Sequence, residues 1–246
     1  MSRLRQPLLA AVAAPLILAL AACGSGEDGT VSGEPIAPVA APAGTSWVET
    51  ASVTPEDGYV IGNPDAPLKL VEYASHTCGA CANFSQESAS AIDEYVESGT
   101  VSYEIRNQIH HPIDLTLAML MRCGEPTAFH PLARQAWANL TEILDRAQQN
   151  QAAMEAAMQA PEAERFQRIG EAAGLLDFFA ARGVSRDQAL QCLADTDKAK
   201  QIVENSNTQS EELNVTGTPT FFLNGRMLTE ARWADVEAAL QAAGAR

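Results

Sequence analysis

Cys78-Gly79-Ala80-Cys81 decides the fold, because it separates two segments with different periodicity. The apolar run Leu68-Lys69-Leu70-Val71-Glu72-Tyr73-Ala74 lies just before it and predicts a strand. The segment after it predicts a helix, because four residues recur at helical spacing: Phe84, Ser88, Ile92 and Val96. The two cysteines are therefore expected at the mouth of a helix, where they can close a small disulfide.

A cysteine pair in this position favours redox chemistry. The first N–H groups of a helix lack partners within the helix, and the macrodipole adds to their preference for an anion. Such a site lowers the pKa of a cysteine from about 8.5 to between roughly 3.5 and 7.5 and gives a reactive thiolate. A purely structural pair and half of a zinc site are the alternatives, although the sequence has no second pair at ligand spacing.

A second motif lies about 140 residues further on, in the run Val215-Thr216-Gly217-Thr218-Pro219-Thr220-Phe221-Phe222-Leu223-Asn224-Gly225. Proline cannot donate to a strand ladder, so Pro219 is expected at the start of a strand. Its X-Pro bond is a candidate for the cis form, although an ordinary trans bond is the alternative. The dipeptide Asn224-Gly225 predicts a type I′ hairpin turn.

Together, these residues resemble the thioredoxin superfamily, in which a cis-proline loop packs beside a CxxC pair. The entry segment from Tyr59 to Tyr73, followed by Cys78 and Cys81, is similar to the DsbA-like branch, and the match covers residues 59–246. Gly79-Ala80 and Thr77 differ from the commonest forms in that branch. The resemblance implies an α/β protein, a thioredoxin fold with an inserted all-helical domain, that acts outside the cytoplasm as a thiol–disulfide oxidoreductase.

The predicted elements divide the chain accordingly. Residues 51–111 and 211–246 are expected to form the thioredoxin-like domain, and residues 112–210 the helical insertion. Within and after the insertion, apolar spacing predicts helices over 114–122, 129–144, 162–173, 175–181, 187–193, 198–213 and 232–243. The polar run Gln148-Gln149-Asn150-Gln151 is expected at a solvated helix end.

The N-terminus predicts export. Residues 1–22 combine two arginines with an apolar stretch, as a signal peptide does. The stretch ends Leu20-Ala21-Ala22-Cys23-Gly24, which resembles the lipoprotein box in which the cysteine is lipidated, with ordinary A-x-A cleavage as the alternative. Residues 23–50 are expected to form a flexible tether, because they are rich in Gly, Ala and Pro and lack an apolar period. The predicted location is the periplasmic side of a bacterial cell envelope.

Cysteine usage fits an oxidising compartment. Of five cysteines, four remain if Cys23 carries lipid. They permit three connectivities, and only the one that pairs Cys123 with Cys192 keeps the CxxC intact. The alternative is two buried free thiols that pack as small apolar groups. A related disulfide occurs in some DsbA-like proteins.

Charge excludes some partners. The chain has 16 basic and 31 acidic residues and a formal net charge of −15. Loss of Arg3 and Arg5 with the signal would bring the charge to −17. Such a charge argues against nucleic acid and against adhesion to anionic lipid head groups.

Glu72 and the histidines are further candidates. A buried Glu72 would have a raised pKa and could move the proton of Cys81, and the resembling family has an acid at this position. The alternative is a strand-edge position that faces solvent. His76 either favours the thiolate as a cation or points to water. His110 and His111 are expected at the surface or a junction, and His130 packed or capping.

The expected function is thiol–disulfide exchange on envelope proteins, with oxidation favoured over reduction or isomerisation. Cys78 is the nucleophile and Cys81 the resolving thiol, while Gly217, Thr218 and Pro219 bind an extended substrate by β-augmentation. No cofactor or metal is expected, but a redox partner must regenerate the pair. The alternatives are a non-catalytic binding module or chaperone with a static disulfide, and a copper metallochaperone, for which a methionine-rich motif near the pair is missing.

Overall fold

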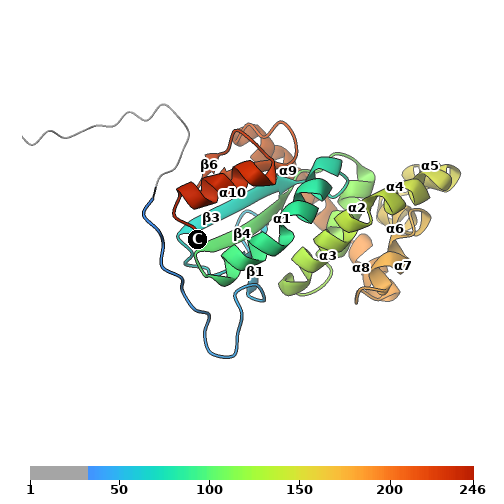
Figure 1. Cartoon of the computed structure of the whole chain (residues 1–246). Coiled ribbons are helices and arrows are strands. Elements are labelled where there is room, and N and C mark those ends of the chain that lie inside the picture. Colours follow the sequence, from blue (N-terminus) through green and yellow to red (C-terminus); the bar gives the residue numbers. More distant parts are fainter. Residues whose placement is uncertain (1–32) are drawn as a thin grey trace, which may run out of the picture.

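The computed structural model describes residues 33–246, so the predicted signal segment and Cys23 lie outside it. Residues 33–246 contain a six-stranded sheet with the strand order β1-β2-β4-β3-β5-β6 (Figure 1). The strands are β1 (Ala51–Val53), β2 (Tyr59–Gly62), β3 (Leu68–Ala74), β4 (Val101–Asn107), β5 (Thr220–Leu223) and β6 (Arg226–Met227). At the centre β3 runs parallel to β4, and β5 pairs with β3 antiparallel. The predicted strand before the CxxC is therefore a central strand.

The two faces of the sheet differ in their cover. α1 (Gly79–Glu97) and α10 (Trp233–Ala242) lie over one face, where Phe84 of α1 packs on Phe221 with ring centroids 4.4 Å apart (Figure 1). On the opposite face, Val71 and Tyr73 line a cavity of about 750 Å³. That cavity includes none of the predicted site residues, so the chemistry is sought on the α1 side.

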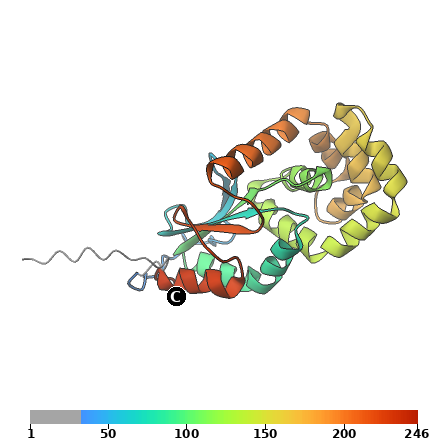
Figure 2. The same cartoon turned by 90° about the horizontal axis from the view of Figure 1, so that it is seen from above.

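Between β4 and β5 the chain forms a helical part, as expected (Figure 2). Its helices are α2 (Pro112–Met121), α3 (Pro126–Ala138), α4 (Leu140–Gln149), α5 (Gln151–Met158), α6 (Glu162–Ala172), α7 (Leu175–Ala180), α8 (Arg186–Leu193) and α9 (Thr196–Glu212). α9 returns the chain from the helical part to the sheet (Figure 2). The architecture confirms a thioredoxin fold with a helical insertion. Throughout residues 33–246, each helix is too short or too polar to cross a membrane.

One predicted helix was wrong. Instead of a single helix over residues 129–144, the chain breaks at Asn139, which has φ −112° and ψ 17° and separates α3 from α4. The Asn139 side chain donates to the carbonyl of Gln135, a local bond that competes with helix continuation. The polar run at 148–151 is also more than a helix end, because α5 begins at Gln151 directly after α4.

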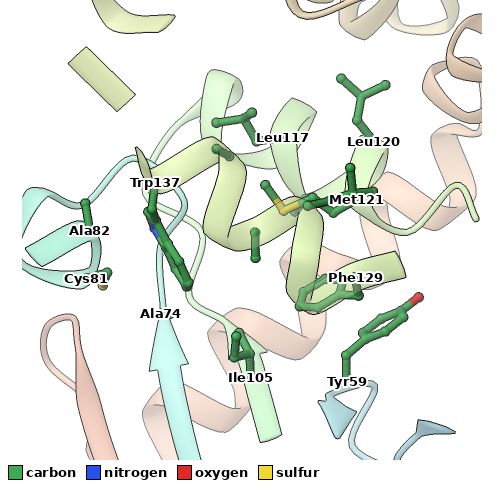
Figure 3. Packing of buried hydrophobic residues seen from close by; sticks show 14 of the residues in the cluster. Tyr59, Ala74, Cys81, Ala82, Ile105, Leu117, Leu120, Met121, Phe129 and Trp137 are labelled. Atoms are coloured by element: carbon green, nitrogen blue, oxygen red, sulfur yellow. The ribbon is translucent and has the colours of Figure 1, made fainter. Parts of the chain in front are cut away.

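The insertion and the sheet share one continuous core. Phe129 of α3 stacks on Tyr59 of β2 with ring centroids 4.1 Å apart. Trp137, further along α3, is 2 % exposed and lies beside the end of β3 at Ala74 (Figure 3). The same cluster contains Cys81, so the predicted site lies where the helical part meets the sheet (Figure 3).

Cys123 and Cys192 form a disulfide in the structure. It joins the segment after α2 to α8, and the two Cα atoms are 5.8 Å apart. The link closes a separation of 69 residues. In the chain-entropy treatment, a loop of this length stabilises the fold by at most about 4 kcal/mol.

The expectation of a flexible tether over residues 23–50 needs correction for its described part. Residues 33–50 run along the body, where the N–H groups of Gly33, Ile36 and Val39 donate to carbonyls at the ends of α10 and α1. Helix ends leave such carbonyls without partners, so the segment satisfies them. Trp47 adds an apolar contact, because it is 9 % exposed and donates to the carbonyl of Val39. Composition alone did not reveal these partners.

Candidate active site

The turn from β3 to α1 places Cys78 at the N-cap of α1. Its backbone is extended, with φ −86° and ψ 121°, and its sulfur accepts a hydrogen bond from the N–H of Cys81 at 3.4 Å. Cys78 is partly exposed and Cys81 is fully buried, and both are free thiols. The two sulfurs therefore belong to one turn of chain but experience different solvation.

The surroundings of Cys78 stabilise its thiolate. Hydrogen bonding from the Cys81 side chain is the largest cause that lowers the pKa of Cys78, to about 5. The backbone N–H groups of Cys81 and Ala80 act in the same direction, whereas partial burial opposes them. The two backbone N–H groups supply the helix N-terminus effect that the spacing predicts, but the Cys81 thiol lowers the pKa of Cys78 more than they do.

Cys81 has the opposite character. Burial raises the pKa of Cys81 far above that of an ordinary thiol. The hydrogen bond between its side chain and that of Cys78 raises this pKa further, and so does the charge of Glu72. Cys81 therefore remains a thiol unless a group inside the protein takes its proton.

The second sequence motif lies directly against the cysteines. The Thr218–Pro219 bond is cis, and the carbonyl of Thr218 accepts a bond from the Cys78 thiol at 3.3 Å across 140 residues of sequence. Gly217 is next to it, and a Cβ placed there would meet nothing within 4 Å. The loop therefore contacts Cys78 through Thr218 and leaves open space at Gly217.

Glu72 lies beneath this pair, on the covered face of β3. Its side chain is fully buried, so the solvent-facing alternative is wrong. Tyr103 of β4 donates its hydroxyl to Oε2, whereas Oε1 has no hydrogen-bond partner among the described residues. Burial raises the pKa of Glu72 to about 8, a negative Cys78 adds to the rise, and the Tyr103 bond opposes it.

His76 fits neither sequence interpretation. It is fully buried, and its Nε2 lies 2.9 Å from the side-chain amide of Asn107. Burial, followed by the charge of Arg122, lowers the pKa of His76 to about 3. A neutral ring cannot stabilise the thiolate as a cation, and its contacts with Phe129 and Trp137 give it a packing role.

The other histidines agree with expectation. His110 and His111 are exposed beside the start of α2. His130 is buried and its Nε2 lies 2.8 Å from the carbonyl of Tyr59. In the described part of the chain, no group of three or more His, Cys, Asp or Glu side chains could hold a metal ion.

Tyr103 is the site residue that sequence reasoning missed. In the parallel register of β3 and β4, Tyr103 pairs with Leu70, two residues before Glu72, so the two side chains lie on the same face of the sheet. The alternating pattern of the second strand could place Tyr103 on the same face, but only once the parallel register is known.

A thioredoxin fold with a CxxC pair at a helix N-terminus and a cis-proline loop against it defines a class of thiol–disulfide redox proteins. Comparison with known proteins agrees. A family model described as thioredoxin matches residues 54–242. A protein-disulfide isomerase from Novosphingobium aromaticivorans is 29 % identical, with a TM-score of 0.70 over 75 % of this chain and 96 % of that one. Wolbachia pipientis alpha-DsbA1, 21 % identical over 74 % of this chain and 91 % of that one, shares the fold with a TM-score of 0.55.

Relatives known by sequence carry similar names. A Rickettsia typhi protein named as a protein-disulfide oxidoreductase is 27 % identical over 68 % of this chain. One from Rickettsia bellii is 26 % identical over 72 % of it. The matches span 54 % and 62 % of the length of these two relatives. The chain therefore belongs to the thioredoxin family.

The pKa contrast predicts selective alkylation. At pH 6, a Cys78 pKa of about 5 leaves roughly ten thiolates for each thiol, whereas Cys81 stays protonated and buried. Iodoacetamide should therefore label Cys78 well ahead of Cys81 in the reduced protein, as measured by peptide mass spectrometry. In urea both cysteines should react alike. Equal labelling in the folded protein would contradict the assignment.

Glu72 predicts a distinctive pH dependence of stability. Because its pKa is raised from 4.5 to about 8 on folding, the folded state holds a proton that the unfolded state has lost between those values. Stability should therefore fall as pH rises through this window, by up to about 1.4 kcal/mol per pH unit from this group.

Glu72→Gln should remove that component. In urea unfolding of the reduced proteins from pH 4.5 to 8, the free energy of unfolding of the variant should rise relative to that of the wild type as the pH increases. Parallel stability curves for the two proteins would rule out a buried, titrating Glu72.

Proposed function

We propose that the protein exchanges disulfides with protein thiols outside the cytoplasm through Cys78 and Cys81, and that substrate oxidation is the favoured direction. The opposed pKa shifts of the two sulfurs carry this proposal. A stabilised Cys78 thiolate favours the reduced protein, which makes its disulfide a stronger oxidant. Each tenfold gain in that equilibrium corresponds to about 30 mV.

In the oxidising direction, a substrate thiolate attacks the sulfur of Cys78. The Cys78–Cys81 bond breaks, a mixed disulfide forms, and the sulfur of Cys81 leaves with the electron pair. A second substrate thiolate then attacks the substrate sulfur of the mixed disulfide and releases Cys78 as a thiolate. Two electrons pass from the substrate dithiol to the cysteine pair, so an external redox partner must reoxidise the pair.

Glu72 supplies the proton that this exchange requires. A Cys81 thiolate is strongly disfavoured by burial, so it must be protonated as it leaves. A carboxyl with a pKa of about 8 is protonated at neutral pH and can donate that proton. In the reducing direction the same carboxylate accepts it, and Oε1 lacks any other described partner.

The loop that contains Gly217, Thr218 and Pro219 is the proposed substrate-binding edge. An extended substrate segment can pair with the backbone of Thr218, which lies next to Cys78, and the open space at Gly217 admits it. Main-chain pairing is tolerant of sequence, which suits an enzyme that acts on many proteins.

Turnover assays separate this function from the alternatives. Catalysed oxidative refolding of fully reduced ribonuclease tests the oxidising direction, and insulin reduction tests the reverse. Cys78→Ser should abolish both activities, and Cys81→Ser should accumulate mixed disulfides. A Cys123→Ser/Cys192→Ser control should retain exchange. A wild type that binds substrate without turnover would favour a binding module. Tight Cu(I) binding would favour a metallochaperone, which needs the two thiolates that burial of Cys81 disfavours.

We also propose that Cys23 is lipidated and holds the protein at the periplasmic side of the envelope. The run Leu20-Ala21-Ala22-Cys23 supports this proposal. The chain also meets the body near Ser98, at the end of α1 remote from Cys78. Nineteen helical residues separate those ends by about 28 Å, which leaves the cysteines clear of an anchor.

Cys23→Ser should move the protein from the membrane fraction to the soluble extract and remove the mass of the lipid, while Cys78→Ser should leave both unchanged. A wild type without lipid mass on its N-terminal peptide would refute the anchor and leave the exchange chemistry intact.

A further inference from the structure

The three residues between β3 and Cys78 are held by side chains from outside their own segment. Ser75, His76 and Thr77 belong to neither strand nor helix, yet Ser75 and His76 are fully buried. A segment outside strands and helices lacks their regular backbone hydrogen bonds, so its position depends on the groups that bond to it. Because Cys78 follows at once, those groups also determine where its sulfur lies relative to the end of α1.

Asp114, in the first turn of α2, makes the main contacts to this segment. Its Oδ1 accepts the backbone N–H of His76 at 2.8 Å, and its Oδ2 accepts the hydroxyl of Ser75 at 2.7 Å. Oδ2 also accepts the backbone N–H of His110 at 3.0 Å. Asp114 is fully buried, so both oxygens are committed to these donors.

The contacts continue as far as the residue before Cys78. The hydroxyl of Ser75 accepts the backbone N–H of Thr77 at 3.2 Å and lies 3.0 Å from its hydroxyl. Asp114 thus connects through Ser75 to Thr77. On the other side, the indole N–H of Trp137 donates to the carbonyl of Ser75 at 3.1 Å.

The chemistry of this position requires a carboxylate. Three donors point at two oxygens, and an ionised carboxyl is an acceptor with room for all of them. An amide would replace one oxygen with an N–H group that faces other donors. A buried donor left without a partner costs roughly 1–3 kcal/mol, and movement of the loop is one way to relieve that cost.

We propose that Asp114 is a positioning residue for the catalytic pair: from the first turn of the helical insertion, it holds Ser75–Thr77 so that Cys78 stays at the N-cap of α1. The helical insertion thereby takes part in the reactivity of Cys78, although Asp114 touches neither sulfur in the structure. This inference rests on the proposed role of Cys78 as the nucleophile.

Asp114→Asn and Ser75→Ala test the inference from the two ends of the contact. Thr116→Val is the matched control, because Thr116 lies in the same helix, is equally buried, and bonds only to the carbonyl of Pro112. The readouts are the pH dependence of Cys78 alkylation and the redox equilibrium of the CxxC pair with glutathione.

Asp114→Asn should raise the pH at which Cys78 alkylation is half-maximal by about one unit. The equilibrium constant with glutathione should become about tenfold less oxidising, a shift of about 30 mV in the reduction potential of the pair. Ser75→Ala should shift both in the same direction by less. The double variant should shift less than the sum of the single ones, because both remove one contact. Thr116→Val should lose stability and keep the wild-type midpoint and equilibrium.

Wild-type values in both Asp114→Asn and Ser75→Ala would overturn the inference, as would an equal shift in Thr116→Val. If Asp114→Asn does not fold, Ser75→Ala decides, because it keeps the carboxylate and removes one of its donors. Failure of the proposed function is distinct: the wild type itself would then show an ordinary thiol midpoint at Cys78.

Discussion

Solvation differs sharply between two sulfurs that one helical turn brings together. The sulfur of Cys78 caps α1 and accepts the backbone N–H of Cys81, while the side chain of Cys81, one turn later, is buried in the core. The strand must therefore end where the helix begins, the helix must bury its third residue, and the loop at Thr218 must lie against the partly exposed sulfur of Cys78. Each of these conditions is met by a different part of the chain, which explains why a short motif needs a whole domain around it.

A carboxyl group buried beneath the cysteine pair costs folding free energy unless hydrogen bonds satisfy it. Glu72 has one partner, Tyr103, and it lies in a central strand that a Val or Ile would fill at lower cost. Because burial disfavours the charged form, the pKa of Glu72 is raised and the carboxyl keeps its proton at neutral pH. A retained proton is what a buried thiolate needs when its disulfide opens. The strand–turn–helix unit brings the carboxyl of Glu72 near enough for its charge to raise the pKa of Cys81, and the register of β3 and β4 adds the hydroxyl of Tyr103.

The sequence predicted the residues that act through local geometry. Cys78 and Cys81 follow from a strand–turn–helix pattern, and Thr218-Pro219 from a proline that opens a strand. What it could not predict depends on contacts between distant segments. His76 looked like a loop side chain, but Trp137 of α3 and Asn107 of β4 lie against it. Its burial lowers its pKa and keeps the ring neutral. In the same way, the segment before Thr50 has a linker's composition, yet helix ends supply partners for its N–H groups.

The division into a thioredoxin domain and an insertion describes the path of the chain better than its packing. Phe129 and Trp137 belong to the insertion by sequence, but they pack against β2 and the end of β3. A helical part that moved as a separate lid would have to break the stack of Phe129 on Tyr59 and the bond from Trp137 to Ser75. Protein cores are packed densely enough that such contacts do not stretch gradually. The part of the insertion nearest the site therefore belongs to the rigid frame of the cysteines.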